Sequence, residues 1–502
     1  MGKSTVTDLR LSTVDGPGRA RTVLDDLRDA AAEHPDRAAV VTWPAGGRTR
    51  ESLTYAELAT VVDRLAAGLV GLGIRRGDVV TLQLPNSWQL VALCLACARI
   101  GAVAGPVALM MRRREVEFVT RLTGSPVYIG QSASRGFSFA RMSREIADAV
   151  PTMRHRVLLD ADQAEVDGAL DFRRDLLDRA WEYELAGLDL DAHEAGPDDL
   201  AQIMFTSGTT GEPKGVMHSH ATLYATNRRQ AEVLHLTGDE VTAMGSPTTL
   251  QGGYTWNFLM PLHLGGTSVQ VGAWDPELML HIIETERVTF FMGAPTFLMD
   301  LVRAQRAAPR DLSTLAVFAT GSAPIPPVLV EDALAVLGCR VYALWGMTEN
   351  GCVTVTRPED PPMRAAQSDG TPVPGMRVRI VDQSTGAPVA PGAVGLLQVR
   401  GDSQRGAEKI PVVEVEGALL RHPAVRDVAL VGYPDERLGE RACAIVEPEG
   451  EPPTLDGLRT HLGELGMAKP YWPERLEIVD VLPRTPSGKV QKFLLRVRLT
   501  GG

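Results

Sequence analysis

The chain is poor in cysteine and shows no pattern of metal ligands. Five cysteines among 502 residues are too few and too scattered for a disulfide framework. Cys94 and Cys97 form a lone C-x-x-C inside an apolar helical pattern, so we interpret them as core residues rather than as a redox or zinc site. The ten histidines show no metal-ligand spacing. We expect His218 and His220 to lie on the face of a helix, with an approach to a bound nucleotide as the alternative.

The sequence also lacks a basic tract and a long apolar run. A net charge of −11 and a pI near 5.5 argue against nucleic acid or an anionic membrane as a partner. The best apolar stretch, Leu90–Met111, is interrupted by Arg99 and predicts a buried helix followed by a strand, not a membrane span. Neither end carries a recognised targeting signal, so we expect a cytoplasmic protein. At this length at least two domains are expected.

Lysine is scarce as well, with six lysines against 45 arginines. Such a bias replaces indifferent surface lysines by arginine, so the lysines that persist are candidates for function. Two of them are Lys214 and Lys489. A lysine is a compact, mobile charge that reaches a carboxylate and a phosphate oxygen together, which a planar guanidinium does less well. A plain surface loop is the alternative for Lys489, and we assign Lys492 only solvent exposure.

One loop is rich in glycine and hydroxyl groups, the stretch TSGTTGEPKG at 206–215. Its glycines let backbone N–H groups converge on an anion, while the Thr and Ser hydroxyls add donors and Lys214 adds charge. The spacing excludes a Walker P-loop. The apolar run Ala201–Phe205 predicts a strand before the loop, and Val216 onward predicts a helix. We therefore predict a phosphate-binding loop rather than a solvated linker.

Strand and helix signals alternate along the chain. Thr54 and Glu57 form a capping box, and Asp275-Pro276-Glu277 opens another helix. This order predicts an α/β fold with a mostly parallel sheet and flanking helices. The predicted strands include Val79–Leu84, Val288–Met292, Leu315–Ala319, Arg340–Leu344 and Arg377–Val381. We place a large domain at 1–402, whose last part is β-rich, and a small domain at 403–502.

Three further motifs follow the loop in a fixed order. They are GSAPIPP at 321–327, LWGMTE at 344–349 and LPRTPSGKVQK at 482–492. With the phosphate loop, they make the chain resemble the superfamily of adenylate-forming enzymes, which includes acyl- and aryl-CoA ligases, peptide-synthetase adenylation domains and beetle luciferases. It is most similar to the acyl-CoA ligases. The resemblance implies a large AMP-binding domain and a small, mobile α/β lid domain.

The resemblance also implies roles for single residues, with ATP, Mg²⁺ and coenzyme A as the cofactors. Lys489 would be the catalytic lysine, Thr348 would contact the α-phosphate, and Glu349 would help to hold Mg²⁺. The implied nucleotide-binding residues are Thr206, Ser207, Gly208, Thr209, Thr210, Gly211, Lys214, Gly321, Ser322, Ala323, Pro324, Trp345 and Gly346. After the adenylate forms, the small domain would rotate and bring 405–416 to the site, with Gly406 beside the incoming pantetheine thiol and Ala407 where relatives have a second glycine.

The substrate would be a small-molecule carboxylic acid. The stretch 246–254 has no acidic residue that would pair an amino acid's α-amine. The predicted pocket residues are Leu250, Gly252, Gly253, Trp256 and Gly293. They favour a roomy apolar pocket for a hydrophobic acid, either alicyclic or medium-chain. Coenzyme A and a carrier protein stay open as the acceptor.

One segment departs from the resemblance. Between VGLLQVRGDS at 394–403 and RGAEKIP at 405–411, relatives carry a few dozen more residues, among them a ribose-binding aspartate and the hinge. Either the sequence omits that segment, as we expect, or the protein lacks it. A true deletion would favour a half-reaction enzyme that only thioesterifies a supplied acyl-adenylate, or a non-catalytic binding protein.

Overall fold

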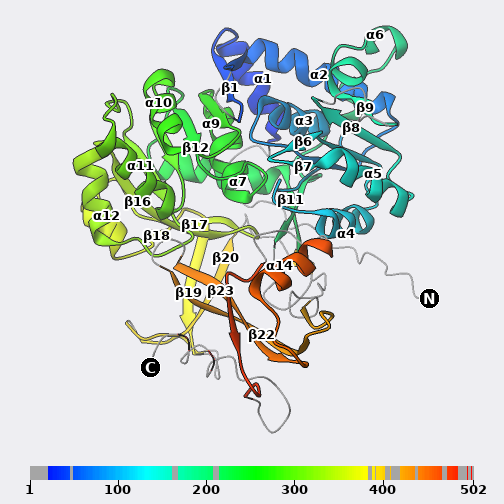
Figure 1. Ribbon diagram of the computed structural model, residues 1–502. Helices are drawn as coiled ribbons and strands as arrows, with labels where there is room; N and C mark the ends of the chain where they lie inside the picture. The colour runs from blue at the N-terminus through cyan, green and yellow to red at the C-terminus, as the bar shows by residue number, and fades with distance from the viewer. Residues whose placement is uncertain are drawn as a thin grey trace.

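The structure is a computed structural model, shown as a ribbon in Figure 1. It describes residues 21–45, 49–160, 168–206, 214–382, 387–390, 392–401, 407–408, 419–435, 439–465, 472–483, 495 and 499. Lys489, Gly406 and 207–211 lie outside these ranges, and so does the junction at 402–406. The predicted roles of these residues therefore stay predictions. In Lys214 only the backbone is described.

An eight-stranded sheet carries the phosphate loop at one end, with strand order β21-β11-β10-β4-β3-β5-β8-β9. Its inner strands run parallel, while β11 and β21 are antiparallel to their neighbours. The strands are β3 (Val79–Gln83), β4 (Val103–Pro106), β5 (Val127–Gln131), β8 (His155–Leu159), β9 (Leu170–Asp171), β10 (Leu200–Thr206), β11 (Lys214–Ser219) and β21 (Ala407–Glu408).

A nine-stranded sheet forms the second layer, in the order β18-β17-β16-β15-β14-β12-β13-β1-β2. The strands from β16 to β1 are parallel. The members are β1 (Ala38–Trp43), β2 (Glu51–Thr54), β12 (Val241–Met244), β13 (Thr267–Val271), β14 (Phe290–Met292), β15 (Val317–Thr320), β16 (Arg340–Met347), β17 (Gly351–Val355) and β18 (Thr371–Pro372). The expected parallel α/β architecture is confirmed, and each predicted strand is present with ends that differ by a few residues.

Helices cover these sheets (Figure 1), and the predicted caps are present. Thr54 and Glu57 form the capping box of α2, and Asp275 caps α10 with Pro276 in its first turn. The helices are α1 (Val23–Glu33), α2 (Tyr55–Gly71), α3 (Trp88–Arg99), α4 (Arg113–Thr123), α5 (Phe139–Ala149), α6 (Trp181–Glu184), α7 (His220–Val233), α8 (Gln251–Gly253), α9 (Met260–Leu264), α10 (Pro276–Glu286), α11 (Pro295–Ala307) and α12 (Pro327–Asp332). Short π- or 3₁₀-helical turns lie at 172–177, 191–193, 254–259, 333–337 and 362–366.

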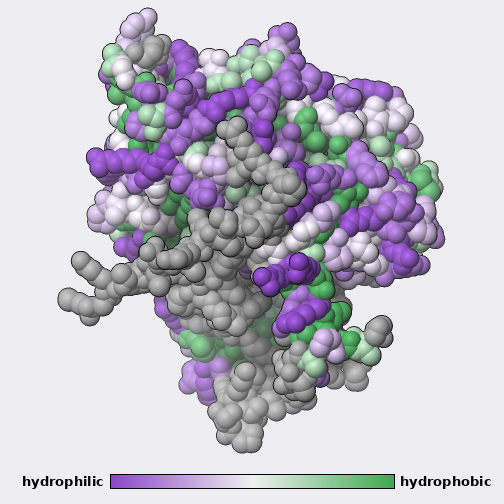
Figure 2. All heavy atoms as spheres, turned by 180° about the vertical axis from the view of Figure 1, so that it is seen from behind, coloured by the Kyte–Doolittle hydropathy of each residue, from purple (hydrophilic) through white to green (hydrophobic). Residues whose placement is uncertain are grey.

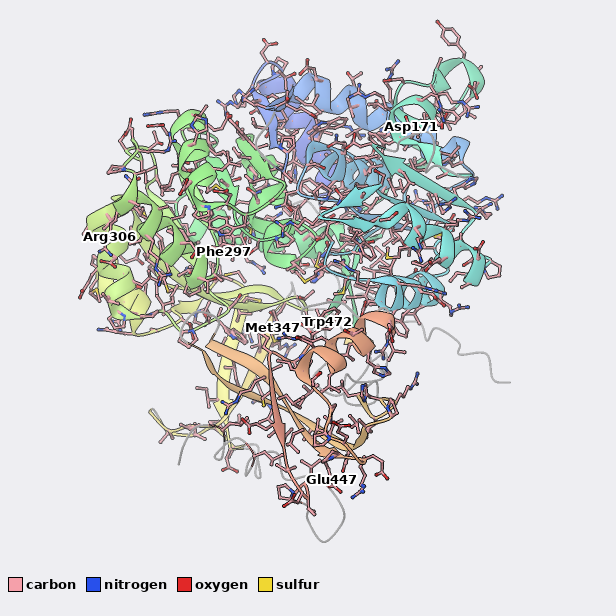
Figure 3. The ribbon with its side chains drawn as sticks, viewed as in Figure 1. Asp171, Phe297, Arg306, Met347, Glu447 and Trp472 are labelled. Atoms are coloured by element: carbon pink, nitrogen blue, oxygen red, sulfur yellow. The ribbon has the colours of Figure 1, made fainter. Side chains whose placement is uncertain are left out.

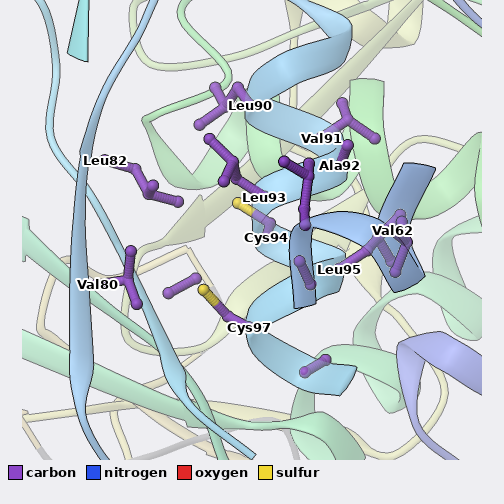
Figure 4. Packing of buried hydrophobic residues seen from close by; sticks show 14 of the residues in the cluster. Val62, Val80, Leu82, Leu90, Val91, Ala92, Leu93, Cys94, Leu95 and Cys97 are labelled. Atoms are coloured by element: carbon purple, nitrogen blue, oxygen red, sulfur yellow. The ribbon is translucent and has the colours of Figure 1, made fainter. Parts of the chain in front are cut away.

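Helix α3 lies in the largest hydrophobic core. Cys94 and Cys97 point into that core beside Leu82 and Val80 of β3 (Figure 4). Both cysteines are buried and free, and burial raises the pKa of the Cys94 thiol to about 12. A thiol with so high a pKa is a poor nucleophile and metal ligand. The interpretation of these two cysteines as core residues is confirmed.

The helix expected from Val216 onward is wrong in its start. Residues 214–219 form β11, which continues the ladder with β10 from Thr206 opposite Lys214 to Leu200 opposite Ser219. Helix α7 begins only at His220, because the Ser219 side chain accepts a hydrogen bond from the amide of Thr222 and caps it. His218 is therefore a strand residue, which corrects its placement on a helix face, while His220 opens the helix.

The rest of the chain is built around smaller sheets. The pair β19 (Met376–Val381) and β20 (Leu396–Gly401) follows the nine-stranded sheet. A separate three-stranded sheet of β22 (Val425–Asp435), β23 (Gly439–Pro448) and β24 (Arg475–Ile478) packs with α14 (Leu455–Glu464). These elements form the lower part of Figure 1. Hydrophilic residues cover much of the large domain in the rear view of Figure 2, and no described helix is long and apolar enough to span a membrane.

Candidate active site

Three parallel strands of the nine-stranded sheet end at a glycine. Gly245 follows β12, Gly293 follows β14, and Gly321 follows β15. A Cβ atom on Gly321 would lie 2.5 Å from the Leu344 carbonyl oxygen, and one on Gly245 would lie 2.6 Å from the Phe297 ring. The glycines thus let the loops and Phe297 (Figure 3) pack closely at the carboxyl edge of the sheet. That edge is where parallel α/β sheets hold their ligands.

The LWGMTE motif forms a β-hairpin. Trp345 and Gly346 belong to β16, while Thr348 and Glu349 lie in the three-residue turn before β17. Gly351 closes the turn with a φ of 62°, as expected for such hairpins. A Cβ on Gly346 would lie 2.1 Å from the Gly351 carbonyl oxygen, so this position is glycine because the two strands approach closely. The turn presents Thr348 and Glu349 half-buried, within reach of a ligand.

The GSAPIPP motif follows β15 directly. Ser322 has a φ of 71°, one of the few non-glycine residues in the left-handed region among those described. Such a conformation is a clue to function when the surrounding structure holds it in place. The Thr320 hydroxyl before it is fully buried and has no hydrogen-bond partner. Ser322 and Pro324 are exposed and Ala323 is half-buried, so a nucleotide base can reach this loop.

The phosphate loop leaves the end of β10 and returns as β11. Thr206 and Lys214 are opposite each other in the ladder, so the loop closes an antiparallel pair. The two-residue strand β21 continues that ladder, with Ala407 opposite Val216 and Glu408 opposite Gly215. Two residues of the segment that we expect to reach the site for thiol transfer, Ala407 and Glu408, are therefore paired with the strand that follows the phosphate loop.

His218 makes a contact with Thr348 that the sequence did not predict. It lies on β11 with 1% of its surface exposed, and its Nε2 atom is 2.6 Å from the carbonyl oxygen of Thr348. The contact joins the strand after the phosphate loop to the turn that carries Glu349. The sequence offered one signal, a histidine four residues after Lys214, but not its partner.

The predicted acyl residues differ in their surroundings. A Cβ on Gly252 would meet the methyl groups of Met244 and Met292 at 3.5 and 3.7 Å, which is ordinary contact. A Cβ on Gly253 would instead lie 2.3 Å from the Pro247 carbonyl oxygen, so backbone packing alone explains that glycine. Three other positions complete the set. Leu250 is 37% exposed, Trp256 is buried and stacks on Phe290 at 5.6 Å, and Gly293 lies against Phe291 and Phe297.

A cleft of about 940 Å³ lies between the large domain and the small one. Helices α4 and α5 and the hairpin of β6 (Ala133–Ser134) and β7 (Phe137–Ser138) form one wall. The end of α14 and Trp472 (Figure 3) form the other. Five arginines line it, against three glutamates, in a protein of net charge −11. The arginines are Arg112, Arg113, Arg114, Arg121 and Arg141.

Aromatic rings accompany these arginines. The Arg112 guanidinium lies 4.2 Å above the centre of the Phe137 ring, and Phe118 and Trp472 also line the cleft. The cleft and the phosphate loop belong to the same sheet edge, because Arg112 follows β4 and the loop follows its parallel neighbour β10. Together they can receive a ligand with an aromatic group and several negative charges.

A magnesium ion, which the resemblance implies, would have few protein ligands. Among the described residues no group of three or more His, Cys, Asp or Glu side chains could hold a metal ion. Magnesium bound with a nucleotide needs only one or two carboxylates, because phosphate oxygens and water supply its other ligands. The half-buried Glu349 beside Thr348 fits that need.

Comparison with known proteins agrees with this geometry. The model of the AMP-binding enzyme family matches residues 27–404, and the model of the AMP-binding enzyme C-terminal domain matches 414–489. The chain is thus an adenylate-forming ligase by class. It belongs to the AMP-binding enzyme family, as the sequence motifs predicted.

The relatives differ in what they make. Triostin synthetase I of Streptomyces triostinicus is 32% identical over 95% of this chain and 94% of its own length. The medium-chain fatty-acid–CoA ligase of Escherichia coli (strain K12) is 28% identical over 95% and 90%. Among solved structures, the amide bond synthetase McbA from Marinactinospora thermotolerans has a TM-score of 0.79 at 24% identity, covering 96% of this chain and all of its own. The alignment with triostin synthetase I has 525 positions, which is more than this chain contributes. At several dozen of these positions the relative has a residue opposite a gap in this chain.

Proposed function

We propose that the protein is an ATP-dependent acyl-CoA ligase that activates a hydrophobic carboxylic acid through an acyl-adenylate and then transfers the acyl group to CoA. The observation that carries the proposal is the arginine-lined cleft at the edge of the sheet that ends in the phosphate loop. Coenzyme A combines an adenine ring with three phosphate groups, and the cleft offers aromatic and guanidinium partners for both.

In the first step, a carboxylate oxygen of the acid attacks the α-phosphorus of ATP. The bond from the α-phosphorus to the bridging oxygen breaks, and pyrophosphate leaves with the electron pair. Magnesium, when bound, neutralises phosphate charge. Lys214 and the hydroxyls of the loop hold the β- and γ-phosphates, Thr348 contacts the α-phosphate, and Lys489 stabilises the charge that develops as the carboxylate attacks. Trp345 and Gly321 to Pro324 flank the adenine.

In the second step, the CoA sulfur attacks the acyl carbonyl carbon, the bond to the phosphate oxygen breaks, and AMP leaves. The pairing of β21 with β11 supports this step, since it holds residues next to Gly406 at the phosphate strand. Residues 405–416 line the thiol's path after the small domain has rotated.

An apolar substrate is supported by the methionine methyl groups around Gly252 and by the absence of an acidic residue at 246–254. Methionine side chains adapt to the shape of an apolar ligand. The similarity to a medium-chain fatty-acid–CoA ligase points in the same direction. The space around Gly252 sets the size of the acid that is accepted.

The alternative is an enzyme that performs only the second half-reaction, or a binding protein. A true deletion between 403 and 405 would favour it, because the resemblance places a ribose-binding aspartate in that segment. A carrier protein is the alternative acceptor, and the observation in its favour is the similarity to a salicyl-AMP ligase / salicyl-S-ArCP synthetase of Mycobacterium tuberculosis.

Two assays on the purified protein separate these possibilities. The first measures pyrophosphate release from ATP and a medium-chain or ring-bearing acid. The second measures thioester formation from supplied acyl-adenylate, with CoA or with free pantetheine as the acceptor. Activity in both assays and a strong preference for CoA support the proposal. Activity in the second assay alone supports the half-reaction enzyme, activity in neither supports a binding protein, and equal use of pantetheine and CoA removes the role of the cleft.

A further inference from the structure

Two buried histidines lie two residues apart and have different surroundings. The His218 ring contacts two partners, with Nε2 at 2.6 Å from the Thr348 carbonyl oxygen and Nδ1 at 3.3 Å from the Thr222 hydroxyl. The His220 ring is also buried, but neither of its ring nitrogens has a hydrogen-bond partner. Only the first histidine makes contacts that lead toward the proposed nucleotide site.

The chemistry of the partners defines the His218 contact. A carbonyl oxygen only accepts hydrogen bonds, so Nε2 carries the proton and donates it to Thr348. The Thr222 hydroxyl faces Nδ1 and is also 2.9 Å from the Ser219 carbonyl oxygen, which fixes its place at the start of α7. The ring thus has a neighbour at each nitrogen, and its donor points at one peptide group.

That peptide group joins Thr348 to Glu349. The turn that contains it has its own support, since the amide of Met347 donates to the Asn350 side chain at 3.1 Å. That bond holds the base of the hairpin, whereas His218 holds the carbonyl at its tip. The two contacts come from different sheets, because His218 is on β11 of the eight-stranded sheet and the hairpin belongs to the nine-stranded one.

We propose that His218 is a positioning residue for the adenylation step. Its Nε2–H group fixes the Thr348–Glu349 peptide relative to the strand that follows the phosphate loop. The threonine and the carboxylate are thereby held in one geometry with respect to the phosphates. This inference rests on the proposed function, in which Thr348 and Glu349 face the α-phosphate and the magnesium ion. A displacement of about 1 Å in such groups can slow a reaction about 100-fold.

The chain offers matched variants for a test. In His218→Leu the donor is lost while the space of the side chain stays filled, and in His218→Gln the amide nitrogen can take the place of Nε2. His220→Leu is the control, because it replaces an equally buried histidine two residues away that has no hydrogen-bond partner. Thermal unfolding of each variant reports any general loss of stability.

Three quantities are measured in each variant: the kcat of pyrophosphate release, the Mg²⁺ concentration that gives half of that rate, and the affinity for ATP with and without Mg²⁺ by calorimetry in the absence of acid. We expect His218→Leu to lower kcat by about 10- to 100-fold and to raise the Mg²⁺ requirement several-fold. The Mg²⁺-dependent part of the ATP affinity should fall with it. His218→Gln should recover most of each loss, and His220→Leu should stay within about twofold of the unmutated protein.

The inference is overturned if His218→Leu and His220→Leu change kcat and the Mg²⁺ dependence equally, or if His218→Gln is no better than His218→Leu. If the unmutated protein releases no pyrophosphate, the proposed function fails. The inference is then decided by calorimetry alone, and equal Mg²⁺–ATP affinity in the unmutated protein and in His218→Leu overturns it.

Discussion

The two large sheets approach the site with different chemistry at the carboxyl ends of their parallel strands. In the nine-stranded sheet, β12, β14 and β15 each stop at a glycine, and apolar groups such as Phe297 and the methionine methyls fill the space. In the eight-stranded sheet, β10 leads into a loop of hydroxyls and lysine, and β4 leads to an arginine-lined cleft. One sheet therefore provides shape and the other provides charge. This division suits the proposed reaction, which joins an apolar acid to polyanionic partners.

The largest expected effect concerns the charge that we expect to act on the phosphates, that of Lys489. Lys489→Ala should slow adenylate formation by about 10²- to 10³-fold, because a cation that acts only while the α-phosphate is attacked is lost. Thioester formation from supplied acyl-adenylate should change little. Both half-reactions are measured in the same mutant, with Lys492→Ala as the control. Equal damage to both steps would indicate a folding or docking defect, and an unchanged adenylation rate would remove Lys489 from that step.

The next effect concerns the apolar side. Gly252→Trp should abolish the use of ring-bearing acids before that of acetate-sized ones, because the indole fills the space now bordered by Met244 and Met292. Gly252→Ala is the control, since its Cβ would make only ordinary contacts. The ratio of kcat/KM for large and small acids gives the answer. Equal loss for both sizes would place the acyl pocket elsewhere.

A smaller effect is expected in the cleft. The double variant Arg113→Gln with Arg121→Gln should raise the KM for CoA about tenfold and leave pyrophosphate release unchanged, because two phosphate partners are lost. Arg174→Gln with Arg179→Gln removes the same charge from ion-paired arginines that do not line the cleft. If both pairs of substitutions shift the KM equally, the effect is one of net charge and the cleft is not the binding site.

The smallest effect at neutral pH concerns His220, the buried first residue of α7. Burial lowers the pKa of its imidazole to about 4, although nearby Asp199 and Asp25 oppose this. The unfolded chain takes up a proton near pH 6.5 and the folded one does not, so the free energy of unfolding falls as the pH drops from about 6.5 to 4. About 2 kcal/mol should be lost between pH 7 and pH 5. The free energy of unfolding, measured with urea, should change less between pH 7 and pH 5 in His220→Leu than in the unmutated protein. An equal change in both proteins would contradict the lowered pKa of His220.

Much of this architecture follows from local signals in the sequence. The capping box at Thr54, the proline at 276 and the alternating apolar runs predict the elements because each depends only on near neighbours. The start of α7 could not be predicted in this way. The choice between strand and helix at 216–219 is made by the ladder with β10, a contact across the phosphate loop.

The site shows the same limit. The motifs that carry the family resemblance contain Thr348, Glu349 and the phosphate loop, so these candidates can be named from the sequence alone. The hydrogen bond from His218 to Thr348 spans 130 residues and two sheets, so no local pattern indicates it. The same holds for the reason behind Gly253, which depends on the approach of the Pro247 carbonyl, and for the arginine-lined cleft, whose second wall comes from α14.

The short length of β21 affects how fast the small domain could move away from the large one. A two-residue strand forms only a few backbone hydrogen bonds with β11, each with a net value of about 0.5–1.5 kcal/mol. Breaking them adds a low barrier, so the small-domain rotation that the proposed mechanism requires could be repeated in every catalytic cycle. When β21 leaves, β11 becomes the open edge of an eight-stranded sheet, and open edges invite pairing with other chains. Brief exposure limits that risk, so the weak strand favours both rapid turnover and solubility.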